Sequence, residues 1–156
     1  MPTPAPTLGS LLRHLIELLD SDVEAAYRAS GLDYRPRYTP VVTALATLGP
    51  ASIRTISQDR GMTHSAVSQT VSLMARDGLV ELTPGEDARE RIVALTPRAQ
   101  AMLPALRRQW DATAEAAASL DAELSAPLSK VAAEAIQALE RRPFAARIAE
   151  ACAADA

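Results

Sequence analysis

The stretch IRTISQDRGMTHSAVSQTVSLMAR, residues 53–76, decides the fold of this chain. Ser57, Gly61 and Val67 follow one another in it at intervals of four and six residues. Two helices that touch need a small residue at the contact, and glycine suits the left-handed turn that often joins them. A β-branched residue then fills the inner face of the second helix. The spacing therefore predicts a helix-turn-helix.

Capping residues set the bounds of the two helices. Ser52 can cap a helix over residues 53–60, and Thr63 can cap a second helix over residues 64–76. The exposed face of the second helix carries hydroxyls, an imidazole and an amide. These groups can form hydrogen bonds with base edges in a major groove. The residues expected to contact DNA on this helix are Thr63, His64, Ser65, Ser68, Gln69 and Ser72.

A β-hairpin is predicted directly after the second helix. Residues 79–82 and 91–95 are the two strands, and Pro84-Gly85-Glu86-Asp87 forms a turn-rich tip. An arginine on such a wing can insert into a narrow minor groove, where negative potential is focused. Arg89 and Arg91 are the candidate contacts, and Asp87 could hold Arg89 in an extended pose.

The run THSAVSQTVSLMARDGLVELTPGEDARERIVALT, residues 63–96, resembles the recognition helix and wing of MarR-family (multiple antibiotic resistance regulator) winged-helix transcription factors. The family's wing has an aspartate, an arginine two positions later, and a leucine-threonine pair eight and nine positions after the aspartate. Asp87, Arg89, Leu95 and Thr96 match this signature at every spacing. The resemblance is close over about residues 38–103.

The resemblance implies a mainly α fold with a small β-wing. A winged helix-turn-helix lobe over residues 35–96 binds double-stranded DNA, and residues 1–34 and 97–156 form a helical dimerisation region. The implied function is that of a homodimeric repressor on a pseudo-palindromic operator, relieved by a small aromatic or phenolic ligand. Gln69 departs from the arginine that many members carry there, which should alter base preference.

The segments outside the lobe show helical patterns. Apolar residues recur at steps of three and four over residues 8–27, as in an amphipathic helix. Further helix starts are predicted at Thr39-Pro40, with Thr39 as the cap, at Thr96-Pro97 and at Ser125-Ala126-Pro127. Pro104 should kink the helix after Thr96 or replace its first turn, and Arg142-Pro143 should break the last long helix.

Charge is divided unevenly along the chain. The net charge is −3, but residues 28–108 hold 11 arginines and 7 acidic residues, whereas the rest of the chain holds 5 basic and 12 acidic residues. The basic centre coincides with the predicted helix-turn-helix and wing, and the acidic ends with the predicted dimerisation region. This division agrees with DNA binding by the centre alone.

An arginine-tyrosine cluster follows the first predicted helix. Tyr34, Arg35, Arg37 and Tyr38 could form a ligand pocket, because arginine can hold a carboxylate and tyrosine can stack on a ring. His14 on the first helix could join them. The alternative is a solvated loop whose rings cap the core.

Other classes of protein fit the sequence poorly. No catalytic constellation is present, so we expect no enzyme and no cofactor, and two histidines and one cysteine far apart predict no metal site. No apolar run is long enough for a membrane helix and the first residues do not form a secretory signal, so we expect a cytoplasmic protein. The alternatives left open are effector-independent or architectural DNA binding, and a winged helix used for protein contacts.

Overall fold

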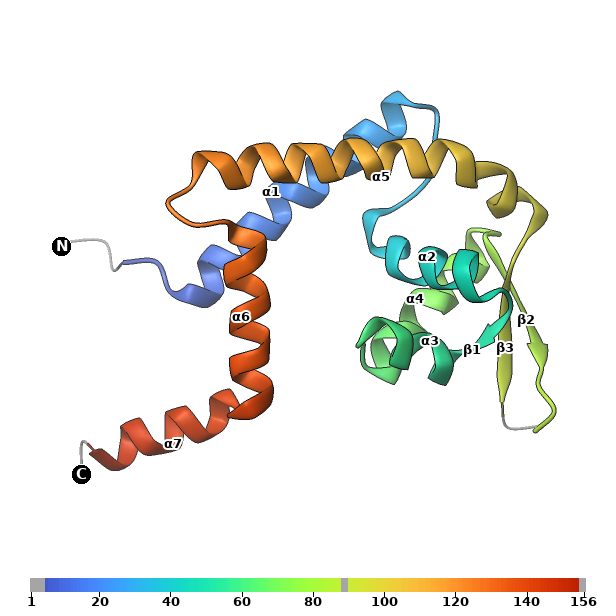
Figure 1. Ribbon diagram of the computed structural model, residues 1–156. Coiled ribbons are helices and arrows are strands. Elements are labelled where there is room, and N and C mark those ends of the chain that lie inside the picture. The colour runs from blue at the N-terminus through green and yellow to red at the C-terminus, as the bar shows by residue number, and fades with distance from the viewer. Residues whose placement is uncertain (1–4, 88–89, 155–156) are drawn as a thin grey trace. The chain divides into compact units, whose positions relative to one another are not determined.

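A computed structural model of the chain describes residues 5–87 and 90–154 (Figure 1). The chain divides into two compact units between Gln109 and Trp110. The described part is mainly helical with one small sheet, as the resemblance predicted. Its elements in chain order are α1 (Leu8–Ala29), the 3₁₀ helix η1 (Pro36–Tyr38), α2 (Thr39–Leu48), β1 (Ala51–Ser52), α3 (Ile53–Arg60), α4 (His64–Arg76), β2 (Val80–Pro84), β3 (Arg91–Leu95), α5 (Pro97–Glu123), α6 (Leu128–Arg141) and α7 (Phe144–Ala154).

The helix-turn-helix is confirmed with its predicted bounds and caps. The Ser52 hydroxyl accepts a hydrogen bond from the Thr55 N–H at 3.1 Å and begins α3. Gly61 takes the left-handed conformation with φ +60°, which glycine adopts at no steric cost. The Thr63 hydroxyl accepts from the Ala66 N–H at 3.2 Å and begins α4.

The core of this lobe lies under the inner face of α4. Val67, Val71 and Met74 are almost completely buried, as is Ile56 of α3. Val93 of β3 is buried to the same extent. Burying an aliphatic side chain of this size contributes roughly 1.5–3 kcal/mol, so this cluster fixes the orientation of α4 on the lobe.

The hairpin is confirmed with shifted bounds and one additional strand. The first strand begins at Val80 and continues to Pro84, and Val80 pairs with Leu95 in an antiparallel ladder. The sheet order is β1-β3-β2, and Ala51 of β1 pairs with Val93. The two-residue strand β1 connects α2 to α3 and attaches the start of α3 to the wing.

The predicted cap of α2 is wrong. Thr39 is the first residue of the helix, with helical backbone angles of φ −52° and ψ −46°, and no side chain caps this end. An N-cap residue needs an extended backbone, which the preceding 3₁₀ helix does not allow. The Thr39 hydroxyl instead accepts a hydrogen bond from the Tyr34 hydroxyl at 3.3 Å.

Helix α1 presents most of its apolar residues to solvent. Thr7 caps the helix as predicted by accepting from the Ser10 N–H at 3.2 Å. Large apolar side chains along α1 remain exposed in the single chain, namely Leu8, Leu11, Leu12, Ile16, Leu18 and Leu19. Only Tyr27 near the end of α1 is buried. The amphipathic pattern therefore forms a helix whose apolar face has no partner within this unit as described.

The last helices begin and end close to the predicted positions. Thr96 caps α5 through the Ala99 N–H at 3.2 Å, and the helix runs on through Pro104, which does not form its first turn. Arg142 ends α6, as predicted. None of the described helices is long and apolar enough to span a membrane.

The cap of α6 comes from a distant residue. Asp121 accepts hydrogen bonds from the N–H groups of Leu128 and Ser129 and from the Ser129 hydroxyl. The Ser129 hydroxyl bond, followed by the backbone bonds, lowers the pKa of Asp121. The predicted start near Ser125-Ala126-Pro127 is close to correct, since Pro127 directly precedes the helix.

Candidate nucleic-acid interface

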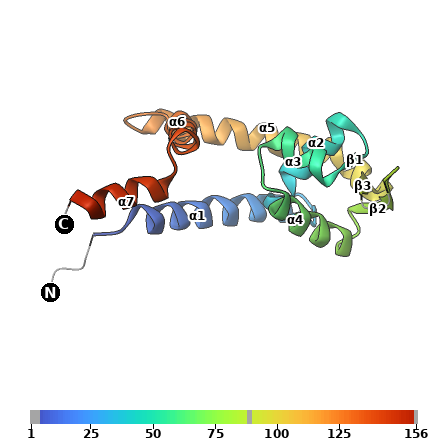
Figure 2. The same cartoon turned by 90° about the horizontal axis from the view of Figure 1, so that it is seen from below.

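The outer face of α4 is open to solvent over its whole length. Of the six predicted contact residues, His64, Ser65, Gln69 and Ser72 are exposed and Ser68 is half-buried along α4, and Thr63 is exposed at the N-cap of the helix. The Ser72 hydroxyl donates to the Ser68 carbonyl at 2.9 Å, which holds this side chain against the helix. Figures 1 and 2 show α3, α4 and the hairpin grouped at one end of their unit. The arrangement fits a helix that enters a major groove.

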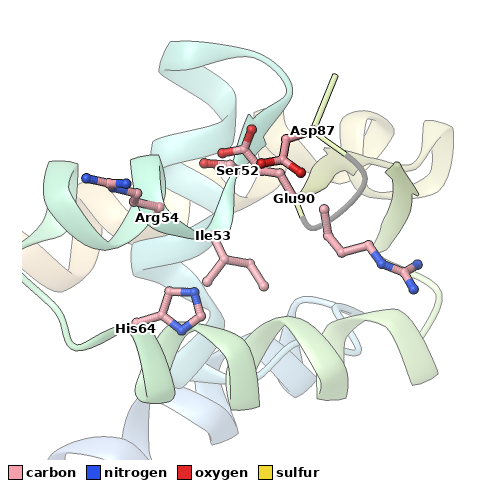
Figure 3. Close-up of a pocket in the computed structure, with 7 residues that line it drawn as sticks. Ser52, Ile53, Arg54, His64, Asp87 and Glu90 are labelled. Atoms are coloured by element: carbon pink, nitrogen blue, oxygen red, sulfur yellow. The ribbon is translucent and has the colours of Figure 1, made fainter. Parts of the chain in front are cut away.

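A groove joins the start of α4 to the wing (Figure 3). Its volume is about 540 Å³, and it is lined by Ser52, Ile53, Arg54, His64, Asp87, Glu90 and Arg91. In Figure 3 the His64 ring lies at the first turn of α4, and the carboxylates of Asp87 and Glu90 lie across the groove from it. The groove therefore combines two arginines with two carboxylates between α4, the helix that would read the bases (the reading helix), and the wing.

Four arginines around α4 are available for an anion. Within residues 5–87 and 90–154, Arg37, Arg54, Arg76 and Arg91 are exposed and form no ion pair. Other arginines of the same unit are engaged, since Arg35 pairs with Asp77, Arg60 with Asp59 and Arg98 with Asp33. A guanidinium without a carboxylate partner is suited to a phosphate oxygen.

The wing tip is only partly described. Arg89 lies outside the described residues, so its predicted contact with the minor groove and its pairing with Asp87 stay predictions. At the described edges of the tip the Gly85 N–H donates to the Glu90 carbonyl at 2.8 Å, and the Glu90 N–H donates to the Asp87 carbonyl at 2.8 Å. Arg91 is exposed at the first position of β3, and it lines the same groove as His64.

A second groove runs along the outer side of α4. Its volume is about 400 Å³, and it is lined by Arg37, Ser68, Gln69, Ser72, Leu73 and Arg76. Arg54 and Arg76 were not predicted as site residues from the sequence, and Arg37 was assigned to a ligand pocket. Their positions in the sequence could have indicated Arg54 and Arg76, because Arg54 lies in the first turn of α3 and Arg76 in the last turn of α4.

The predicted ligand-pocket tyrosines are part of the core. The Tyr34 ring packs edge-to-face between Tyr27 and Tyr38, with centroids 4.9 and 5.9 Å apart, and all three side chains are buried. Burial raises the pKa of Tyr34. Burial and the hydrogen bond to Asp77 raise the pKa of Tyr38 to about 12. The rings therefore cap the core, as the alternative interpretation of this cluster held.

The other predicted pocket residues are dispersed. Arg35 Nε lies 3.7 Å from Asp77 Oδ2, next to the tyrosines. Arg37 lines the groove on α4. His14 precedes Tyr27 by 13 residues on the same helix, which places it about 20 Å away along the axis. The structure thus keeps Tyr34, Arg35 and Tyr38 together and does not bring His14 to them within one chain.

Comparison with known proteins agrees with this geometry. Residues 30–90 match the model of the MarR family. No protein with a curated function matches the chain by sequence. Among solved structures, the chain is similar to the Mycobacterium tuberculosis transcriptional regulator MosR in complex with DNA, with 20% identity, a TM-score of 0.64, and coverage of 94% of this chain and 98% of that chain.

Two further structures share the fold. Bordetella bronchiseptica BpsR is 17% identical with a TM-score of 0.62, and the match covers 91% of this chain and 98% of that one. The PcaV transcriptional regulator from Streptomyces coelicolor is 20% identical with a TM-score of 0.58, over 90% of this chain and 99% of that one. Residues 30–90 thus match the MarR family over the helix-turn-helix and most of the wing, and the solved structures share the fold over most of the chain.

Proposed function

We propose that this chain is a homodimeric repressor that binds a pseudo-palindromic operator in double-stranded DNA. The observation that carries the proposal is the open face of α4, whose hydrogen-bonding side chains line or adjoin two grooves that contain arginines. Serine hydroxyls and a glutamine amide can bond base edges, and glutamine pairs bidentately with adenine. The MosR structure was solved in complex with DNA, which supports the same role for this lobe.

Exposed apolar faces support the homodimer. The apolar face of α1 is open within its unit, and in the other unit Val131, Ile136 and Leu139 of α6 and Phe144 and Ile148 of α7 are also exposed. Apolar surface on this scale favours association with another chain. A two-fold dimer would place two reading helices in successive major grooves, with half-sites about 34–36 Å apart.

Release by a small aromatic ligand is the regulatory part of the proposal. The BpsR structure concerns regulation of DNA binding by 6-hydroxynicotinic acid, and PcaV was solved with its natural ligand. Such a ligand would act by favouring one spacing of the two reading helices over another. A repressor of this kind performs no catalysis, needs no cofactor or metal, and works in the cytoplasm where it meets DNA.

One observation favours an effector-independent alternative. Tyr34 and Tyr38 are buried with bonded hydroxyls, and Arg35 is paired with Asp77, so these predicted ligand contacts already have partners within the chain. Architectural or constitutive binding needs no effector pocket. The two functions differ in whether an aromatic acid raises the melting temperature of the protein or weakens its DNA binding.

Footprinting of the region upstream of the gene tests the proposal. We expect two protected segments about one helical turn apart, and loss of both when an aromatic acid that binds the protein is added. Protection that persists with every aromatic acid tested supports the effector-independent alternative. A purified protein that protects no segment in moderate salt contradicts the proposed function.

A further inference from the structure

The groove on the outer side of α4 contains a residue from outside the helix-turn-helix. Arg37 belongs to η1, which precedes α2, yet it lines this groove together with Ser68, Ser72 and Arg76 of α4. Arg37 and Arg76 are both exposed. Two guanidinium groups from separate elements therefore line this groove together with short polar side chains.

The nearest carboxylate in sequence does not neutralise this pair. Asp77 follows Arg76 directly, but its Oδ2 accepts the Tyr38 hydroxyl at 2.6 Å and lies 3.7 Å from Arg35 Nε. No acidic residue lines the groove, and Arg37 and Arg76 form no ion pair within the described part of the chain. Tyr38 and Arg35 thus engage the Asp77 carboxylate, and the charged residues that line the groove are the two arginines.

The position of the groove indicates that a DNA phosphate would bind in it. Ser68, Gln69 and Ser72 line the groove and also belong to the face that would read bases. A helix in a major groove has a sugar-phosphate backbone on each side, so a phosphate must come close to the rim of this face. The wing-side groove with Arg54 and Arg91 lies at the other end of α4, beside His64.

We propose that Arg37 and Arg76 bind backbone phosphates of the operator along the second half of α4. This inference rests on the proposed function and adds to it a contact that the helix-turn-helix motif does not include. The serines at positions 68 and 72 are short enough to let the backbone approach both guanidinium groups. The pair fixes the register of α4 in the groove and carries no base preference itself.

Salt dependence of DNA binding tests the inference. The probes are a duplex that the protein itself enriches from a random library and a scrambled duplex of the same length. For Arg37→Gln and for Arg76→Gln we expect similar reductions in affinity on both duplexes, about tenfold for each phosphate that is no longer bound. The slope of log K against log salt should become shallower by about 1 for each such phosphate, or about 2 for a dimer. The charge-matched control is Arg13→Gln on the polar face of α1, which should change neither affinity nor slope.

The outcomes separate this inference from the function on which it rests. Wild-type protein that does not distinguish the two duplexes contradicts the proposed function. Wild-type protein that discriminates while both arginine variants keep its affinity and slope overturns only the phosphate contacts. A reduction confined to the enriched duplex also overturns them, because it would make these arginines base readers. Binding of inorganic phosphate that is abolished by Arg37→Gln, with DNA affinity unchanged, would assign the groove to a small anion instead.

Discussion

The Tyr38 hydroxyl donates a hydrogen bond to Asp77 Oδ2 at 2.6 Å, across 39 positions of sequence. This bond attaches η1 to the residue that ends α4, since Asp77 is the C-cap of that helix. Arg35 approaches the same carboxylate oxygen at 3.7 Å. The end of α4 is therefore anchored to the segment that carries Arg37.

Removing this bond should weaken the lobe measurably. Tyr38→Phe keeps the buried ring and deletes the hydroxyl, and Asp77 remains partly solvated, so we expect a decrease of about 1 kcal/mol in the free energy of unfolding. Urea denaturation at pH 7 measures it. Tyr34→Phe is the matched control, since it deletes the longer bond to Thr39 at 3.3 Å and should cost less. Equal stabilities of wild type and Tyr38→Phe would show that the bond contributes nothing.

Stability should also fall at alkaline pH because of the same residue. The pKa of Tyr38 is raised from 10.0 to about 12 in the folded chain, so the unfolded state releases this proton first. The corresponding stabilisation is complete below pH 10 and is lost as the pH rises from 10 towards 12. Urea titrations across this range should show a decline that is smaller in Tyr38→Phe. A variant with the wild-type pH profile would assign the decline to other groups, such as Tyr34.

The turn of the helix-turn-helix should not tolerate a side chain at Gly61. Its φ of +60° is strained for any L residue, although a Cβ there would meet no atom within 4 Å. Gly61→Ala should therefore cost about 1 kcal/mol through the backbone alone. Gly9→Ala in α1 is the control, because helical alanine should leave stability unchanged or slightly raised. Thermal unfolding of both variants measures the difference, and an unaffected Gly61→Ala would mean that the turn relaxes freely.

Sequence preference should depend on Gln69. Gln69→Ala removes the only amide on the reading face, and a good bidentate pair contributes about 1–3 kcal/mol of discrimination against the wrong base. We expect weaker binding to the enriched duplex, unchanged binding to a scrambled one, and an unchanged salt slope. Competition binding measures all three quantities. A reduction shared equally by both duplexes would make Gln69 a backbone contact.

The apolar face of α1 should mediate self-association. Ile16 is 56% exposed in the single chain, and Ile16→Glu places a charge where a second copy would pack. Sedimentation should show a dimer for wild type and a shift towards monomer for the variant. Arg13→Glu on the polar face is the control and should remain dimeric. An Ile16→Glu protein that stays fully dimeric would move the interface away from this face.

Local chemistry made much of the lobe predictable. The interval from Ser57 through Gly61 to Val67 and the caps Ser52 and Thr63 each act within a few residues, so the sequence determines them directly. Strand β1 could not be predicted, because two residues show no alternation and pair only with the distant strand β3. The predicted cap at Thr39 was wrong because the 3₁₀ helix before it already supplies helical backbone.

The exposed face of α4 could be predicted from the sequence, but the arginines beside it could not. The exposed residues of α4 follow from helical periodicity once the buried valines are placed. Arg37 was assigned to the tyrosine cluster because the sequence places it between Tyr34 and Tyr38. In the structure the rings face the core and Arg37 faces α4, a separation that depends on how η1 packs against that helix.

The most direct test of the central claim is fluorescence anisotropy with two labelled duplexes in about 0.15 M salt. One duplex is enriched by the protein from a random library, and the other is its scrambled form. We predict a preference of at least about a thousandfold for the enriched duplex, which is the lower end for specific binding, with two protein chains per duplex. Equal affinity for the two duplexes, or no binding to either, would contradict the claim that the open face of α4 reads DNA.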